Sequence, residues 1–351
     1  ISVWGHDFRP EYQQLSILRE RFPSVPRMAL TATADEQTRQ EIIDRLLITP
    51  KCFITSFDRP NIRYRMQEKT QGYLEQIAHF VLGEHMHESG IVYCATRRRV
   101  EEVAEFLGKK GIKVLMYHAG LDSETRQKNQ QLFFEHPCLM IATIAFGMGI
   151  DKADVRFVIH VDMPRSIENF FQESGRAGRD GRPAESILYF GLEDVVQQRY
   201  FIENSDSDEL YKQVSLHKLD SMLGLAESVQ CRRKLLLAYF GEKTPSCGNC
   251  DNCENPPQVK NVVTDAQKLL SCIYRCSQTN NLGFGASHII NVLRGEATDR
   301  VFEKNHQELP TFGIGKDGSL KYWRKILRQL ITRHYVDVNY QCRNVLSVNA
   351  K

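Results

Sequence analysis

The chain has 351 residues, enough for two or three domains with hydrophobic cores, and its 42% hydrophobic and 25% charged residues are typical of a globular protein. This composition excludes a disordered or fibrous chain, and the longest apolar stretch, around Leu235–Phe240, is far shorter than the roughly 18 residues of a membrane span. No signal peptide is visible, and because the first residue is Ile1 rather than Met we expect that residues are missing upstream.

The net charge of +3 is unevenly distributed along the chain. Residues 258–351 hold 14 Lys and Arg against 7 Asp and Glu, whereas the rest of the chain carries a small negative excess. A basic C-terminal region on a near-neutral body predicts a polyanionic partner for that region.

Short apolar runs alternate with amphipathic stretches from Arg27 to about Phe190, which predicts strands alternating with helices and a parallel sheet of the α/β class. Such sheets place their ligand-binding loops at the carboxyl ends of the strands. Pro60 predicts a hinge at residues 58–61. The predicted strands are Arg27–Leu30, Cys52–Ser56, Ile91–Cys94, Val114–Tyr117, Leu139–Ala142, Val155–His160 and Ser186–Phe190, and the predicted helices are Asp35–Leu47, Tyr73–Leu82, Arg97–Lys110, Ser123–Phe134 and Ile167–Ala177.

After about Arg199 the strand pattern stops, and Pro256-Pro257 marks a domain boundary. Three helices followed by two alternating runs predict a winged helix at the C-terminus, where a basic surplus suits contact with DNA. The predicted elements are helices at Leu210–Ser228, Arg232–Phe240, Thr264–Cys276, Ala286–Arg294 and Ser319–Arg333 and strands at Tyr335–Val338 and Val345–Val348, and the apolar face of the last helix holds Leu320, Trp323, Ile326, Leu327, Leu330 and Ile331.

Two arginines, Arg176 and Arg179, lie at the end of a predicted helix with small residues between them. A positioned arginine neutralises the charge that develops in phosphoryl transfer, an effect of about 10³–10⁵ in rate in the best cases. The plain alternative is an exposed helix end with cationic caps. Hydroxyl- or glycine-bearing strand ends at residues 31–34, 96–97 and 143–151 surround the same predicted sheet and offer donors to phosphates, so we favour a functional loop.

Four of the ten cysteines, Cys231, Cys247, Cys250 and Cys253, are clustered. Four thiolates at this spacing predict a closed, tetrahedral structural Zn²⁺ site, with free thiols or an iron–sulfur cluster as the alternatives. Metal binding rather than a disulfide framework indicates a reducing, cytosolic setting.

Two further groups of side chains predict contact with nucleic acid. Near the N-terminus Trp4, Phe8 and Arg9 are suited to stacking on bases, although isolated aromatic residues more often belong to a core. The polar face of the helix at 319–333 carries four cations that either contact the DNA backbone or form a solvated face, namely Lys321, Arg324, Lys325 and Arg328.

Together these motifs resemble the RecQ family of superfamily 2 DNA helicases, and the resemblance covers essentially the whole chain. It implies RecA-like parallel-sheet motor lobes followed by a helical zinc-binding module and a winged-helix domain, with borders at 1–57, 58–200, 201–257 and 258–351. The residues that carry it are Trp4–Pro10, Thr31–Ala34, Ser56–Asn61, Tyr117–Gly120, Phe146–Asp151, Gln172–Asp180 and the four cysteines.

The resemblance implies an ATP- and Mg²⁺-dependent 3′-to-5′ helicase that unwinds duplex and branched DNA in recombination and repair. Its implied partners are single-stranded and duplex DNA and single-stranded-DNA-binding protein, with no membrane, and its implied location is the cytoplasm, or the nucleoid in a bacterium. Arg176 and Arg179 are expected to reach the γ-phosphate of ATP, with Arg179 as the arginine finger. The other expected contacts are Gln172, Gly149 and Asp151 to the nucleotide and Trp4, Phe8, Arg9, Thr96, Arg97, Thr143, Lys321, Arg324, Lys325 and Arg328 to DNA.

The family's Gly-Lys-Ser/Thr phosphate loop and DEAH box, which hold the phosphates and Mg²⁺, do not occur in these 351 residues. We therefore expect the chain alone to lack ATPase activity and to be part of a longer helicase. The alternative is a non-catalytic DNA-binding scaffold with a degenerate motor domain. An RNA-directed helicase is a weaker third possibility, because the cysteine module and winged helix accompany DNA work in the family.

Overall fold

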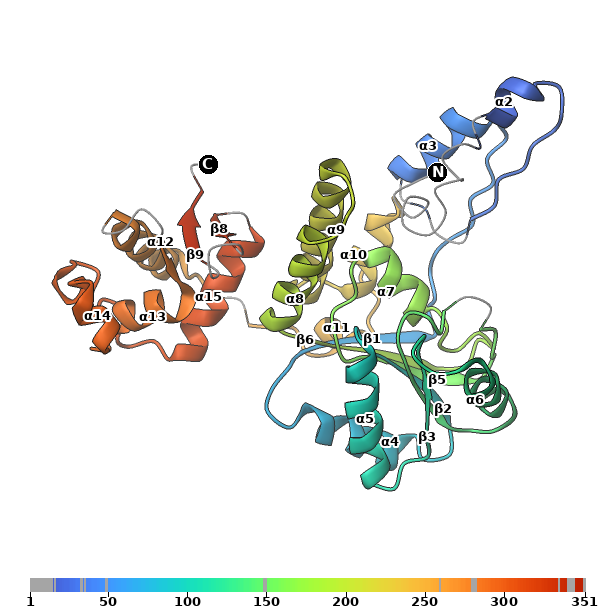
Figure 1. Ribbon diagram of the computed structural model, residues 1–351, viewed down its shortest axis with the longest axis horizontal. Helices are drawn as coiled ribbons and strands as arrows, with labels where there is room; N and C mark the ends of the chain where they lie inside the picture. Colours follow the sequence, from blue (N-terminus) through green and yellow to red (C-terminus); the bar gives the residue numbers. More distant parts are fainter. Residues whose placement is uncertain are drawn as a thin grey trace. The chain divides into compact units, whose positions relative to one another are not determined.

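The computed structural model describes residues 15, 17–31, 34, 36–47, 50–147, 150–258, 260–278, 283–333, 335–339 and 345–349 (Figure 1). The chain divides into two compact units, Ile1–Pro257 and Gln258–Lys351.

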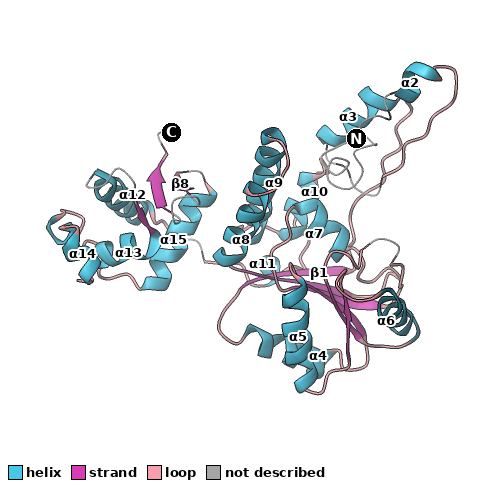
Figure 2. Cartoon of the chain, in the orientation of Figure 1, coloured by secondary structure: helices cyan, strands magenta, loops and turns pink. Residues whose placement is uncertain are grey.

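The first unit is built on a six-stranded sheet in the order β1-β6-β5-β2-β4-β3, with every pair of neighbours parallel (Figure 2). Its inner strands are almost continuous apolar runs, because they are buried on both faces. The strands are β1 (Ile62–Glu68), β2 (Ser89–Tyr93), β3 (Val114–Tyr117), β4 (Leu139–Ala142), β5 (Val155–His160) and β6 (Ala184–Phe190).

Helices cover both faces of this sheet (Figure 1). On one face, α4 (Tyr73–Glu84) and α5 (Arg97–Lys109) pack their apolar stripes against the sheet. The other face is covered by α6 (Ser123–Glu135) and α7 (Ile167–Ser174), which share a core with the helices that follow β6. The result is the α/β/α arrangement predicted from the alternation of strands and helices.

Four helices after β6 form the module that carries the cysteine cluster: α8 (Leu192–Glu203), α9 (Glu209–Glu227), α10 (Arg232–Tyr239) and α11 (Asp251–Glu254). Apolar side chains of α9 and α10 belong to the same hydrophobic core as the sheet. The module is therefore packed on the lobe rather than tethered to it. Because α8 runs through position 200, the border predicted between residues 200 and 201 falls inside a helix.

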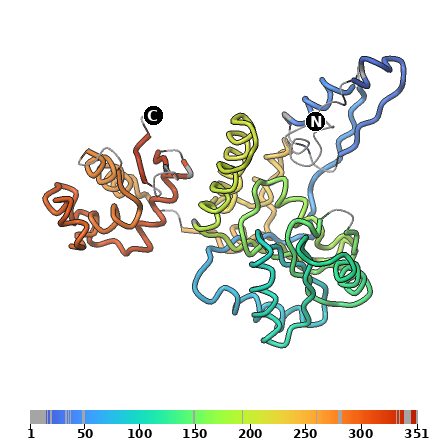
Figure 3. Tube along the Cα trace, viewed as in Figure 1, coloured from blue at the N-terminus to red at the C-terminus, as the bar shows by residue number. Residues whose placement is uncertain are grey.

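The segment before the sheet contains α2 (Ile17–Arg21) and α3 (Glu36–Leu46), and the Cα trace leads from it into β1 (Figure 3). The strands predicted at 27–30 and 52–56 are wrong, since both runs are irregular in the structure. Met28, Leu30 and Phe53 are 84%, 87% and 81% exposed. Among the described residues neither run has a strand beside it, and apolar runs form strands only where a neighbour completes the ladder.

The second unit contains α12 (Val263–Gln278), α13 (Ala286–Arg294), α14 (Asp299–Glu303) and α15 (Leu320–Thr332), with a short 3₁₀ helix at His306–Glu308. A three-stranded antiparallel sheet joins β7 (Phe284–Gly285), β9 (Val345–Val348) and β8 (Val336–Asn339). The predicted apolar face of α15 is confirmed, because Trp323, Leu327 and Leu330 are buried in the core of this unit. Helices followed by a small β-ribbon form a winged helix.

Among the described residues, none of the helices combines the length and the apolar character that crossing a bilayer would demand.

Acid is expected to destabilise the Gln258–Lys351 unit. The rings of His288 and His306 are buried and share a hydrogen bond of 2.7 Å between Nε2 and Nδ1, with Phe284 stacked on His288. Burial, reinforced by the neighbouring His306, Arg300 and Lys304, lowers the pKa of His288 to about 4. In the unfolded chain His288 is therefore protonated below about pH 6.5, whereas in the folded unit it is protonated only below about pH 4.

The free energy of unfolding should thus be constant above pH 7 and fall by up to about 3 kcal/mol between pH 6.5 and pH 4. Urea unfolding at several pH values, followed by the fluorescence of Trp323 in a Trp4→Phe background, measures this change. In a His288→Gln variant the slope in this pH range should be smaller, and an unchanged slope would contradict the assignment to His288.

Candidate functional site

The loop after α7, Gly175–Asp180, carries both candidate arginines and is called the arginine loop below. Its backbone is fixed to the amino end of β5, because Gly178 N donates to Val155 O at 2.8 Å and Asp180 N donates to Ala153 O at 3.2 Å. The arginine loop therefore lies at the amino edge of the sheet and not at the carboxyl ends of the strands, where such sheets usually place their ligand-binding loops. The reason is that α7 runs back across the sheet, so that its C-terminus lies at the edge where β5 and β6 begin.

The two arginines differ in their surroundings. Arg179 forms an ion pair with Asp151, whose side chain is 82% exposed. Arg176 is half-buried, donates to Ile150 O at 3.3 Å and lies beside the Tyr93 hydroxyl, whose pKa is raised by burial although Arg176 opposes the rise. Exposed ion pairs contribute only about 0.2–1 kcal/mol, so Arg179 can exchange Asp151 for a stronger anion at little cost.

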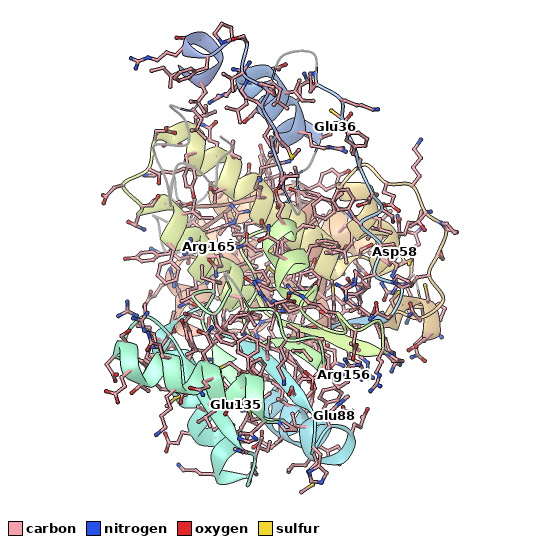
Figure 4. All side chains as sticks on the ribbon, turned by 90° about the vertical axis from the view of Figure 1, so that its right-hand side faces the viewer. Glu36, Asp58, Glu88, Glu135, Arg156 and Arg165 are labelled. Atoms are coloured by element: carbon pink, nitrogen blue, oxygen red, sulfur yellow. The ribbon has the colours of Figure 1, made fainter. Side chains whose placement is uncertain are left out.

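A cavity of about 1640 Å³ adjoins the arginine loop. Its other wall is formed by residues 23–31 and 50–59 together with Glu36. Glu36 and Asp58 of this wall are labelled in Figure 4. The predicted nucleotide-site residues Gln172, Asp151, Arg176 and Arg179 are thus brought to one cavity. Gly149 lies outside the described residues.

Helix α7 is held over the sheet by buried polar contacts that sequence reasoning missed. His160 Nε2 on β5 lies 2.8 Å from Glu173 Oε2 on α7, and the ring of His160 stacks against Tyr93. A histidine and a glutamate inside apolar runs are the signal that could have identified this pair, because buried ionisable groups are normally paired.

The candidate DNA-gripping residues lie together at the opposite edge of the sheet, where β2 and β4 end side by side. Thr96 caps α5, its hydroxyl accepting from Arg99 N at 3.2 Å, and Arg97 is exposed in the first turn of that helix. Thr143 follows β4, and its hydroxyl accepts from Ala145 N at 3.4 Å. Arg97 is therefore the member of this group whose side chain is open to a ligand.

A largely buried triad that sequence reasoning missed anchors the loop at Thr96. Lys69 Nζ lies 2.9 Å from Asp162 Oδ1 and 2.5 Å from Asp194 Oδ1, and Asp162 Oδ2 accepts from Ala95 N at 2.9 Å. Burial raises the pKa of Asp194 to about 6, and the neighbouring Asp162 adds to the rise, although Lys69 opposes it. The triad ties the ends of β1, β2 and β5 to the start of α8.

Four sulfur atoms form the candidate metal centre, and all lie within 4.8 Å of one another. The Sγ atoms of Cys231 and Cys250 are 4.0 Å apart, and those of Cys247 and Cys253 are 3.9 Å apart. A tetrahedral Zn²⁺ with Zn–S bonds of about 2.3 Å separates its sulfurs by about 3.8 Å, so the residues fit this ion closely.

Backbone amides complete the metal centre. Cys231 Sγ accepts from Lys234 N at 3.5 Å and from Cys247 N at 3.2 Å, and Cys250 Sγ accepts from Arg232 N at 3.4 Å. Burial raises the pKa of the Cys231 thiol, but the amides of Lys234 and Cys247, together with the thiols of Cys247 and Cys253, outweigh it and bring that pKa down to about 7. Such N–H···S bonds favour thiolates, the form that binds metal.

On α15 the structure separates the four predicted DNA-contacting cations. Lys321, Arg324 and Lys325 are exposed, whereas Arg328 is only 6% exposed. The helix packs against α12, α13 and β8, so it is covered on more than one side. Arg328 is therefore removed from the exposed face to which its sequence position assigned it. The N-terminal candidates Trp4, Phe8 and Arg9 lie outside the described residues.

Three known domain families match the chain in succession. Residues 72–181 match the helicase conserved C-terminal domain, residues 192–254 the RecQ zinc-binding domain and residues 256–351 the RQC domain. The chain is also 47% identical to an ATP-dependent DNA helicase RecQ of Haemophilus influenzae, over 96% of this chain and 54% of that protein. The chain belongs to the RecQ helicase family.

A second RecQ relative, from Pasteurella multocida, is 46% identical over 100% of this chain and 55% of its own length. The chain thus spans just over half the length of these RecQ relatives. Among solved structures, Saccharomyces cerevisiae Dbp5 bound to RNA and ADP BeF3 matches 62% of this chain and 61% of its own with a TM-score of 0.46 and 17% identity. The RecQ zinc-binding match and the four-sulfur geometry together support a structural zinc site.

Proposed function

We propose that this chain supplies the second motor lobe, the zinc-binding module and the RQC winged helix of an ATP-dependent 3′-to-5′ DNA helicase that unwinds duplex and branched DNA in recombination and repair. The observation that carries the proposal is the arginine loop, which brings Arg176 and Arg179 to the wall of one cavity. Binding to single-stranded-DNA-binding protein and a cytoplasmic or nucleoid location remain predictions from the family.

The residues at the cavity suit a nucleotide's phosphates. Two guanidinium groups and the Gln172 side chain line the cavity, and within the described part of the chain Arg179 is paired with an exposed carboxylate. ATP with Mg²⁺ would supply the phosphoryl group and the charge that these donors neutralise. Arg179 would leave Asp151 for the γ-phosphate, while Arg176, fixed by Ile150 O, would keep the loop oriented.

DNA binding is proposed at three places. Arg97, beside Thr96 and Thr143 at the carboxyl edge of the sheet, would hold the backbone of a single strand and move with the lobe. Trp4, Phe8 and Arg9 would stack on bases. Lys321, Arg324 and Lys325 on α15 would contact duplex phosphates, so the RQC unit would bind with little sequence preference.

The test is ATP hydrolysis by the full-length protein, which in the proposal includes the lobe with the phosphate loop and DEAH box. Single-stranded DNA should stimulate hydrolysis, and a duplex with a 3′ single-stranded tail should be unwound. The 351-residue chain alone should hydrolyse no ATP. If the full-length protein binds DNA but neither hydrolyses ATP nor unwinds duplex, the protein is a non-catalytic scaffold and not a helicase. ATP hydrolysis by the 351 residues alone would contradict the proposal that the ATP site is shared between this chain and the lobe with the phosphate loop and DEAH box.

Removing the three exposed cations of α15 is expected to weaken duplex binding by this chain and to flatten its salt dependence. Each cation that no longer neutralises a phosphate lowers the slope of log K against log salt by about 0.9, so Lys321→Ala, Arg324→Ala and Lys325→Ala together should reduce it by about 2–3. Fluorescence anisotropy between 50 and 200 mM NaCl, on duplexes of two sequences, measures the slope. A Lys304→Ala, Lys316→Ala variant should keep the original slope, and an equal decrease in both variants would assign the effect to net charge.

A further inference from the structure

Residues 58–61, called the connector below, join the N-terminal segment to β1 and contact the arginine loop through two side chains, of which the first is Arg59. Its Nη1 donates to Gly175 O at 2.8 Å, and its Nη2 donates to Ala177 O at 2.8 Å and to Gly178 O at 2.9 Å. Gly175 is the C-cap of α7, where backbone C=O groups have no partner within the helix, and Ala177 and Gly178 lie in the turn that follows it. A guanidinium suits this place because its planar fork satisfies several acceptors at once and its charge opposes the helix dipole.

The second side chain of the connector that is hydrogen-bonded to the same loop is that of Asn61. Asn61 Nδ2 donates to Gly178 O at 2.8 Å and to Arg182 O at 2.8 Å. Gly178 has a φ of +57°, and a Cβ there would lie 2.5 Å from Asn61 Nδ2. The loop can therefore approach the connector this closely only with glycine at position 178.

The connector is itself held by the zinc-binding module. Arg233, on the helix that starts directly after Cys231, donates from Nη2 to Arg59 O, Pro60 O and Ile62 O at 3.2, 3.2 and 2.6 Å. Its Nε lies 3.2 Å from Asp58 Oδ1. Arg233 is buried, so its charge is satisfied by the connector rather than by water.

The same module fixes the residues on either side. Phe57 stacks on Phe240 at a centroid distance of 5.0 Å, and its amide donates to Glu242 Oε2 at 2.9 Å. On β1, Met66 N donates to Asp251 Oδ2 at 2.8 Å, and Asp251 is paired with Arg232. A continuous set of direct contacts therefore runs from the cysteine cluster through α10 to the connector, and from Arg59 to the arginine loop.

We infer that Arg59 is a positioning residue for Arg176 and Arg179, and that the zinc-binding module sets the geometry of the arginine loop through Arg233. The consequence for catalysis rests on the proposed function, whereas the structural link does not. Arg59 also lines the cavity, but both of its terminal nitrogens donate to backbone carbonyls of the loop, so we expect it to act through the two arginines rather than on the nucleotide. Its removal should loosen residues 175–182 and reduce turnover while leaving nucleotide and DNA binding nearly intact.

The test uses Arg59→Ala and Arg59→Lys, with Arg63→Ala as the matched control. Arg63 is the next arginine along the chain, pairs with Glu185 and Glu254 and makes no described contact with the loop. Zinc content and thermal unfolding show whether each variant is folded. Hydrogen exchange of the 351-residue chain then reports on the amides of residues 175–182, and steady-state ATPase assays of the full-length protein separate kcat from KM.

In Arg59→Ala, exchange at residues 175–182 should rise at least about tenfold, and kcat should fall by about 10–100-fold with KM for ATP changed less than about threefold, as expected for misplacement of a transition-state contact. In Arg59→Lys the decrease in kcat should be smaller, because the lysine ammonium keeps the positive charge but loses the planar guanidinium. If the alanine variant does not fold, the lysine variant decides whether Arg59 positions the loop. Exchange no different from that in Arg63→Ala would overturn the inference. A wild-type protein that hydrolyses no ATP would defeat the proposed function instead, and the exchange data would still decide whether Arg59 holds the loop.

Discussion

Replacing Arg179 by alanine is expected to lower kcat for DNA-stimulated ATP hydrolysis of the full-length protein by about 10³–10⁵, the effect of removing an arginine that neutralises the transferring phosphoryl group. Folding should be unaffected, because the ion pair that Arg179 makes among the described residues is with the exposed Asp151 at the cavity wall. DNA binding should also be retained, since the arginine loop lies at the opposite edge of the sheet from Arg97. Steady-state ATPase assays at saturating DNA measure the change.

Arg182→Ala is the matched control for this prediction. Arg182 lies three residues further along in the same exposed turn, and its described contact with the connector is made by its backbone carbonyl. The Arg182→Ala substitution therefore removes the same charge without changing the cavity wall, and kcat should change less than about threefold. A similar decrease in both variants would mean that the loop acts through its total charge, and full activity in Arg179→Ala would remove Arg179 from the reaction.

Replacing Cys250 by serine is expected to yield protein that is insoluble or free of zinc. Binding of a structural Zn²⁺ contributes about 10–16 kcal/mol in small zinc modules, as much as the whole stability of a typical domain. Cys250 is fully buried and shares its core with the sheet, so the damage should extend beyond the knuckle. Zinc content of the purified protein and its circular dichroism on heating measure both effects.

Cys52→Ser serves as the control, because Cys52 is exposed and lies outside the cluster. It should retain one zinc per chain and an unchanged unfolding temperature. A Cys250→Ser protein that is well folded, binds DNA and unfolds at the original temperature would show that the metal is dispensable, and the zinc site would then have no structural role.

Five of the six strands of the sheet were predictable from sequence, whereas the edge strand β1 was not. The predicted ranges of β3, β4 and β5 agree with the structure to the residue, because all three are nearly continuous apolar runs, although only β4 and β5 are deeply buried and β3 is a half-buried edge strand. Strand β1 escaped notice, since Arg63 and Arg65 interrupt its apolar residues, although Ile62, Tyr64 and Met66 alternate as a half-buried strand requires. The error at 27–30 and 52–56 has the opposite cause, because an apolar run alone does not provide the neighbouring strand.

The residues of the candidate site were easier to predict than their arrangement. Arginines three apart after a helix, and cysteines at metal-ligand spacing, are local signals. Their supports are not local, since Arg59 meets carbonyls 116 to 119 positions away and Arg233 meets carbonyls 171 to 174 positions away. The burial of Arg328 likewise depends on how α15 packs, which its own periodicity does not determine.

The proposed mechanism requires that the arginine loop binds the phosphoryl group in the transition state of its transfer more strongly than it binds the nucleotide in the ground state. Equilibrium binding of ADP with aluminium fluoride, compared with binding of ADP alone, tests it most directly in the full-length protein with single-stranded DNA present. Arg179→Ala should weaken binding of the aluminium fluoride complex by about 10³ and binding of ADP by less than about threefold. Equal affinity of the wild type and the variant for the aluminium fluoride complex would contradict the account.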